Sequence, residues 1–324
     1  MSLLDAAYHI GLESNYAEQA TPTRSYEAQS LDPRTETQML RRAGFRKGSQ
    51  AARHAKTIVI GSEHPLVMDV QHSGMGLLLQ ALVASTTGPT QVAATSAYTQ
   101  EHDWGAAGIT DSLTCQQAIQ FPETGSSIFT HVGCMATGFR FRQSADGLLQ
   151  LEVDLVGADV VTDVAEAAAA YVSDPGCFDW SQMELTVDSA AFADGTSFEW
   201  SIDTAMKTTR YAMRNSRLRK KPVHTGYPTV GGTIQSEWTK TEFYDDFVNG
   251  AEIPLNAKWT GVPDAIEAGH THEFEIDMGA IVFAGDAPTQ QPDDVAMQSL
   301  PFEVVEPTSG PLFSIKTKSA DTAL

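Results

Sequence analysis

The sequence lacks the features that mark an exported, disulfide-stabilised or membrane-spanning protein. Its 324 residues include three cysteines, which are too few and too odd in number for a disulfide framework. The longest apolar run, residues 74–84, is far shorter than the roughly 20 residues that a transmembrane helix needs. No signal-peptide pattern is visible near the start. We therefore expect a protein that folds in the cytosol with reduced thiols at Cys115, Cys134 and Cys177.

Motifs for catalysis are also missing. Neither the phosphate-loop pattern GxxxxGK[ST] nor GxGxxG, GxSxG or HExxH occurs. His270 and His272 share one side of an extended segment, but two further metal ligands would have to come from elsewhere, which favours a polar strand start. Cys115 and Cys134, with His131, match no signature of a nucleophilic enzyme, so we expect small buried side chains. We predict no enzymatic activity, no catalytic residue, no metal and no cofactor.

Basic residues are scarce and are gathered in two islands. The net charge is −20, with 21 Lys and Arg against 41 Asp and Glu. Residues 41–56 and 207–221 hold 13 of these bases and no acid, so the rest of the chain has a net charge of −33. Either island alone is explained by solvated surface, but together they suggest that basic patches of one copy meet acidic patches of the next. Nucleic-acid binding ranks lower, because the acidic background repels phosphate.

Period-two alternation of apolar and polar residues predicts a β protein. The clearest case is a hairpin over residues 135–157, with Asp146-Gly147 at its turn. Its second strand places Leu149, Leu151, Val153 and Leu155 on a buried face and Gln150, Glu152 and Asp154 on a solvated one. Further strands are predicted at residues 57–60, 66–70, 113–119, 127–132, 183–187, 198–202, 253–259 and 274–283.

Three short helices and two arms complete the prediction. One helix follows a Ser73 cap and ends at Gly88-Pro89, one begins with the capping-box spacing of Asp163 and Glu166, and one covers residues 241–249 before Gly250. Residues 14–50 are polar and are expected to have little regular structure. The Pro-rich residues 287–324 are expected to form a tail with short edge-strand pieces. The predicted fold is mainly β, a barrel or sandwich with one to three short helices.

Several segments, taken in order over residues 10–283, resemble the major tail tube proteins of long-tailed bacteriophages. Residues 10–14 with 21–24 are similar to that family's N-terminal arm, and residues 66–70 with 74–83 to its strand and apolar helix. The remaining similar segments are 98–102 with 112–114, 129–134 leading into 139–157, and 243–250 before 253–261. We expect an N-terminal arm and loop (1–56), a β tail-tube domain (57–286) and a Pro-rich C-terminal arm (287–324).

The resemblance implies a structural virion subunit. Subunits of this family assemble in rings of six that stack into a hollow tube, through which the genome is ejected. The implied partners are copies of the chain itself, a tape-measure protein, and tail terminator and tip proteins, with no membrane. The implied location is the virion tail, after folding and assembly in the bacterial host cytoplasm.

A bore through which DNA passes without adhesion should be acidic or neutral, because cations that touch phosphate add affinity. The acidic-wall candidates are Gln150, Glu152, Asp154, Glu275 and Asp277. The basic islands would then lie at contacts between subunits or rings. The candidates for these contacts are Arg41, Arg42, Arg46, Lys47, Arg53, Lys56, Arg210, Arg214, Arg217, Arg219, Lys220 and Lys221.

Three other interpretations stay open at this point. A secreted β-sandwich carbohydrate-active enzyme or binding module fits the strand pattern but lacks a visible export signal. A tube subunit of a contractile tail or of a tail-like injection device would share the same fold. A capsid decoration protein is the remaining alternative.

Overall fold

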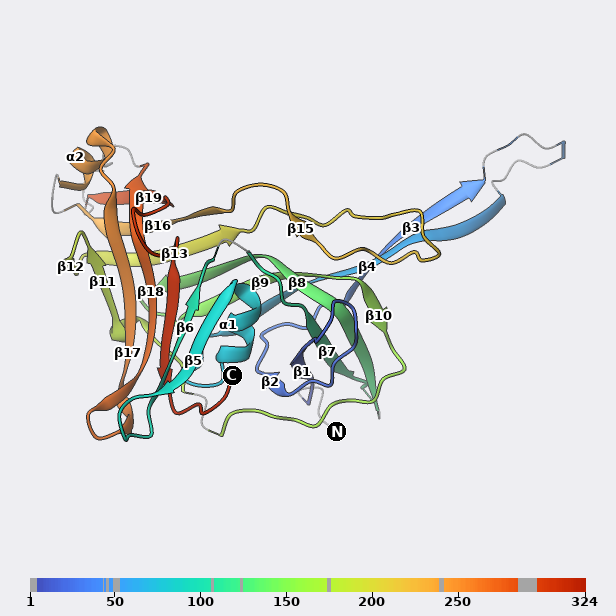
Figure 1. Ribbon diagram of the computed structural model, residues 1–324, viewed down its shortest axis with the longest axis horizontal. Helices are drawn as coiled ribbons and strands as arrows, with labels where there is room; N and C mark the ends of the chain where they lie inside the picture. The colour runs from blue at the N-terminus through green and yellow to red at the C-terminus, as the bar shows by residue number, and fades with distance from the viewer. Residues whose placement is uncertain are drawn as a thin grey trace.

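The computed structural model describes residues 5–42, 44, 47–48, 53–105, 108–122, 125–173, 176–238, 242–284 and 296–324. Over these ranges the chain is mainly β, as predicted, with two antiparallel sheets that face each other and a smaller sheet at one end (Figure 1). The strand pairings run from β3 (Arg34–Arg42) at one margin to β5 (Ser85–Gln91) at the other. In the described residues these two strands do not pair with each other, so the arrangement is a sandwich and not a closed barrel. No helix in the described ranges has the length and hydropathy needed to cross a membrane.

The first sheet has the order β3-β4-β9-β8-β13-β16-β19, with every neighbouring pair antiparallel. Its strands are β3 (Arg34–Arg42), β4 (Arg53–Asp69), β9 (Gln150–Gly157), β8 (Ser126–Ser144), β13 (Gly195–Asp203), β16 (Thr229–Glu237) and β19 (Met297–Val304). The predicted hairpin of residues 135–157 is confirmed as the central pair of this sheet, β8 and β9. Leu149, Leu151, Val153 and Leu155 are buried, as predicted from their alternation.

The second sheet has the order β5-β6-β20-β18-β17-β11-β12, again all antiparallel. Its strands are β5 (Ser85–Gln91), β6 (Tyr98–Asp103), β20 (Ser314–Ser319), β18 (His270–Phe283), β17 (Ile253–Glu267), β11 (Met183–Val187) and β12 (Ala190–Phe192). The end of β18, residues 281–283, also pairs with β19 and so joins the two sheets along one side.

The smaller sheet continues from the first half of β8. It contains β7 (Leu113–Gln120), β1 (Ala7–Leu12), β2 (Arg24–Tyr26) and β10 (Asp159–Val161). The remaining elements are α1 (Gly76–Leu82), α2 (Glu242–Asn249), the 3-10 turn η1 (Trp180–Gln182), and the short pair β14 (Met206–Lys207) and β15 (Val223–His224). Helix α1 is buried along most of its length, where it contacts β8, β1 and β6.

Aromatic side chains fill the space between the two large sheets. Trp200 and Phe313 lie 4.8 Å apart between ring centroids, in an edge-to-face arrangement. The rings of Phe141 and Phe274 are 5.4 Å apart, and those of Phe198 and Trp259 are 6.0 Å apart. Each of these three pairs joins the first sheet to the second, and such pairs contribute about 0.5–1.5 kcal/mol beyond the burial of their area.

Several sequence predictions differ from the structure. Residues 34–42 form β3 instead of an irregular arm; their strand was hidden because they are largely exposed and show no alternation. Residues 57–60 and 66–69 belong to one strand, β4, which ends before Val70. Strands β19 and β20 each lie between two partners and are not edge pieces.

Two helix predictions also need correction. The segment after Asp163 is not helical, because the N–H of Ala167 binds Gln116 Oε1 (2.6 Å) and that of Ala170 binds Ser25 Oγ (2.8 Å). Helix α1 begins after Met75 with no side-chain cap, so Ser73 is not its cap, and residues 85–91 form β5. The helix before Gly250 is confirmed as α2, and Gly250 adopts a φ of +60° there.

Truncation of the inter-sheet core tests this architecture. We expect Phe141→Ala to lower the free energy of unfolding by about 3–5 kcal/mol, because the buried ring contacts both sheets. Phe121→Ala is the matched control, since Phe121 is 47% exposed, and should change stability by about 0.5 kcal/mol or less. Urea unfolding followed by tryptophan fluorescence measures both, and equal losses would contradict the assignment of the core.

Candidate functional site

The first basic island lies on the β3–β4 hairpin, which projects far from the rest of the molecule (Figure 1). Arg41, Arg42, Lys47 and Lys56 are exposed. Arg53 begins β4, and Arg46 lies outside the described residues. Strand β4 joins β9 only from Ser62 onward, and beyond the bridge between Ile60 and Leu218 the described residues of the hairpin pair only with each other. The outer part of the hairpin therefore presents unpaired strand edges next to positive charge.

The second basic island lies in the long segment 204–228, which carries β14 and β15 and extends alongside β4 (Figure 1). The N–H of Ile60 in β4 donates to the carbonyl of Arg217 at 3.2 Å, so the two islands are neighbours. Arg214 donates to the carbonyl of Leu218 (3.1 Å), and Lys221 donates to the carbonyl of Thr110 (2.7 Å). Arg210 donates to the carbonyl of Lys221, while Arg217 is exposed and Lys220 partly exposed.

Arg219 differs from the other basic residues because it is buried, with 2% of its surface exposed. Its guanidinium pairs with Glu36 of β3 and lies 3.7 Å from Glu63 of β4. A side chain at Gly61 would meet that guanidinium at 3.2 Å, so the glycine leaves room for it. Arg219 therefore attaches the 204–228 segment to the hairpin within one subunit, and its burial leaves it little surface for a contact with another copy.

The five acidic-wall candidates lie on two opposite outer faces of the sandwich. Gln150, Glu152 and Asp154 point away from the core on β9, in the first sheet. Glu275 and Asp277 point away from it on β18, in the second sheet. The rings of Phe141 and Phe274, which lie between the sheets, separate these faces. The structure does not bring the five side chains together, since alternation assigns a face within each strand but not the relation between sheets.

On the first sheet, the acids alternate with arginines. Glu152 lies 2.9 Å from Arg142 and 3.4 Å from Arg140, and both arginines also approach Glu199. An open polar groove of about 820 Å³ contains Glu152 and Asp154, and Met206 and Thr208 of the basic segment line it as well. This face is therefore partly covered by a part of the chain that carries positive charge.

The second sheet has a cross-strand row of alternating charge. The successive partners across β11, β17, β18, β20 and β6 are Glu184, Lys258, Glu275, Lys316 and Glu101. Two residues to either side of Glu275 on β18 are Glu273 and Asp277. Glu273 binds Lys258 (2.8 Å) and Lys318 (2.9 Å), and Asp277 binds Lys316 (3.1 Å). Burial raises the pKa of Glu273, but the hydrogen bonds from these lysines outweigh it, and the net pKa is lowered.

A buried carboxylate that sequence reasoning did not single out fixes the N-terminal strand. Glu13, just after β1, is 7% exposed. It accepts hydrogen bonds from Ser112 Oγ (2.7 Å), Thr114 Oγ1 (2.9 Å), and the N–H groups of Gly133 (2.8 Å) and Ala17 (2.9 Å). The sequence indicates the role of Glu13 only by placing an acidic residue directly after an apolar strand. The segments 10–14 and 129–134, noted above as similar to the tail tube family, are thus in contact.

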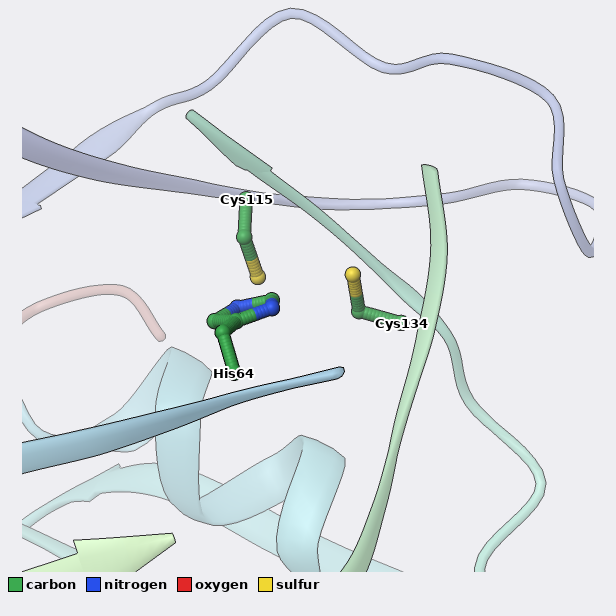
Figure 2. Close-up of side chains that lie close together, drawn as sticks. All are labelled: His64, Cys115 and Cys134. Carbon is green, nitrogen blue, oxygen red and sulfur yellow. The ribbon is translucent and has the colours of Figure 1, made fainter. Parts of the chain in front are cut away.

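Cys115 and Cys134 are buried, as predicted, and His270 begins strand β18. His272 stacks on His72 with ring centroids 5.0 Å apart, and its Nδ1 lies 3.2 Å from the carbonyl of His72. Metal-ligand atoms instead come together at His64, Cys115 and Cys134, all within 4.8 Å of one another and all buried (Figure 2). Burial raises the pKa of the Cys134 thiol and lowers that of His64. Cys177 is partly exposed.

These features define a structural β protein whose charged residues are distributed over projecting arms and broad sheet faces. The profile of the phage tail tube protein family matches residues 4–304, and the chain belongs to that family. No curated protein matches the chain. Membership makes it a structural protein of the virion tail, which assembles into a tube with other tail proteins.

Loss of the Arg219 ion pairs should release the 204–228 segment. We expect Arg219→Met to speed cleavage at the exposed Tyr211 by chymotrypsin about tenfold, which corresponds to about 1.4 kcal/mol of local stability. Lys220→Met, one residue away and partly exposed, is the control and should cleave at the wild-type rate. Equal cleavage of the two variants would show that Arg219 does not hold the segment.

The lysine contacts of Glu273 predict a pH-dependent contribution to stability. A lowered folded-state pKa contributes stability above the unfolded value, and this contribution is lost as the pH falls through the folded value. We expect Glu273→Gln to lower the unfolding free energy at pH 7 by less than about 1 kcal/mol, because the site is a quarter exposed. The difference from wild type should shrink as the pH falls below the ordinary value of 4.5. Unfolding curves across this range, with Glu303→Gln as an exposed control, measure it; a constant difference would contradict the assignment.

Proposed function

We propose that this chain is the major tail tube subunit of a long-tailed phage, that it forms stacked rings of six, and that it has no enzymatic role. The genome passes through the bore of the stacked rings during ejection. The observation that carries this proposal is the β3–β4 hairpin, whose projecting outer half needs further contacts to be stable. Isolated two-stranded hairpins are marginal in water, and in the described residues both edges of this one are unpaired beyond the bridge from Ile60 to Leu218.

The exposed side chains of the hairpin support a contact with a neighbouring subunit. Met39 and Leu40 are each 60% exposed at adjacent positions, so the arm has apolar side chains on both of its faces. Arg41 and Arg42 follow directly. The remainder of the chain is strongly acidic, which gives the arm a complementary surface on another copy. The exposed bases of the 204–228 segment lie beside the same arm and extend this contact surface.

Of the two acidic faces, the outer face of the second sheet is the better bore lining. The first-sheet face lies partly under the basic 204–228 segment, whereas a bore that does not bind DNA needs neutral or negative charge. On the second sheet each lysine is paired with at least one carboxylate, which reduces its attraction for phosphate. Glu275 and Asp277 therefore line the bore, and Gln150, Glu152 and Asp154 face away from it.

The other parts of the tail follow from this role. A tape-measure protein occupies the bore during assembly, and terminator and tip proteins close the ends of the tube. Folding and assembly take place in the host cytoplasm. A contractile tail or a tail-like injection device would use the same subunit contacts and would differ by an external sheath.

Assembly in vitro tests the arm contact. We expect concentrated wild-type protein to form rings or tubes in negative-stain micrographs, and the double variant Arg41→Glu/Arg42→Glu to stay monomeric with an unchanged circular dichroism spectrum. The charge-preserving variant Arg41→Lys/Arg42→Lys is the matched control and should assemble. Tubes from the glutamate variant at the wild-type yield would contradict a role for the arm.

A further inference from the structure

Four metal-binding side chains from three strands converge in the buried region where the first sheet joins the smaller one. His64 comes from β4, Cys115 from β7, and His131 and Cys134 from β8. His64 is 1% exposed and the other three are fully buried. Figure 2 shows the side chains of His64 and Cys115 pointing toward one another, with the sulfur of Cys134 close beside them.

The backbone of β8 is shaped so that two of these residues reach the same side. His131 and Cys134 are three positions apart, which in a regular strand would place them on opposite faces. The pairing of β7 with β8 shifts between Leu113 and Cys115, so that β8 contains one extra residue there. Gly133 has a φ of +71° at this point, which is the backbone of a bulge that resets the alternation. Glu13 holds that glycine through its N–H at 2.8 Å.

The imidazoles in this region have nitrogen atoms without a partner. Both ring nitrogens of His131 and the Nδ1 of His64 are buried and make no hydrogen bond. A buried polar atom left without a partner is destabilising, so a native structure normally supplies one. The other nitrogen of His64, Nε2, lies 3.2 Å from the hydroxyl of Tyr8, which orients the ring. The rings of His64 and His131 are 4.3 Å apart between centroids.

We propose that Cys115, Cys134 and His64 bind one zinc ion, with His131 as the fourth ligand. Two thiolates and two imidazoles are the donor set of tetrahedral structural zinc sites. Zn–S bonds of about 2.3 Å and Zn–N bonds of about 2.0–2.1 Å place neighbouring ligand atoms roughly 3.3–3.8 Å apart. The atoms of the first three residues already lie within 4.8 Å of one another, so binding requires them to approach by no more than about 1–1.5 Å.

Zinc in this position would join β4, β7 and β8 inside one subunit. Binding releases the two thiol protons to solvent and leaves both metal and sulfur in their original oxidation states. The site departs from the sequence-based expectation of no metal, which rested on spacing along the chain. That spacing could not reveal it, because His64 is 51 residues from Cys115 and the bulge at Gly133 is a property of the folded strand pair.

Metal analysis of the full-length protein tests this proposal without any mutation. We expect protein produced with zinc, or refolded with zinc under reducing conditions, to retain about one zinc per chain after dialysis, measured by inductively coupled plasma mass spectrometry. Refolding with Co²⁺ should give thiolate-to-cobalt charge-transfer absorption and the intense visible bands of a tetrahedral site. Zinc below about a tenth of an equivalent per chain, together with no such cobalt spectrum, would overturn the proposal.

Cysteine variants and a count of free thiols distinguish bound zinc from the alternative, a disulfide between Cys115 and Cys134. Cys115→Ala/Cys134→Ala should reduce bound zinc at least tenfold, and Cys177→Ala, the matched control, should keep the full equivalent. Protein denatured with a chelator, without reductant, should show three free thiols. One free thiol and a mass two hydrogens lower would show a Cys115–Cys134 disulfide instead and would overturn the proposal. Undiminished zinc in the double cysteine variant would do the same.

Discussion

The structure depends on the apolar contact between its two large sheets. Trp200, Phe141 and Phe198 from the first sheet meet Phe313, Phe274 and Trp259 from the second, and all are almost completely buried. Full burial of one such side chain contributes about 1.5–3 kcal/mol relative to exposure, so this layer is a leading source of fold stability. Because the core lies between the sheets, their outer faces and projecting hairpins are free to carry polar and charged residues.

This division explains how a subunit with many exposed strands can be a stable component of a tail. The sandwich is complete by itself, whereas the outer half of the β3–β4 hairpin and the 204–228 segment bury few apolar side chains of their own. The Arg219 ion pairs hold these two parts together, and the Glu13 carboxylate holds the N-terminal strand against β7 and β8. The parts that the core does not stabilise are those that we assign to contacts with neighbouring copies.

The sequence revealed those features that involve one strand and one buried face. Residues 149–155 alternate without interruption, and their hairpin was predicted correctly, as was α2 with its terminal Gly250. Residues 34–42 were missed because a strand exposed on both faces has no alternation to detect. The helix expected after Asp163 was wrong because tertiary hydrogen bonds to Ala167 and Ala170 replaced helical ones. The opposite placement of Glu152 and Glu275, and the convergence of His64 with Cys134, depend on how the sheets are joined, which local patterns do not encode.

We infer that the core is complete in the single subunit and that the arms become ordered against other copies. Hydrogen–deuterium exchange with mass spectrometry, performed on monomers and on assembled tubes, tests it most directly. We expect strong protection of β8, β13 and β18 in both states, and protection of the outer half of the β3–β4 hairpin only in tubes. Equal exchange of the hairpin amides in monomers and tubes would contradict it.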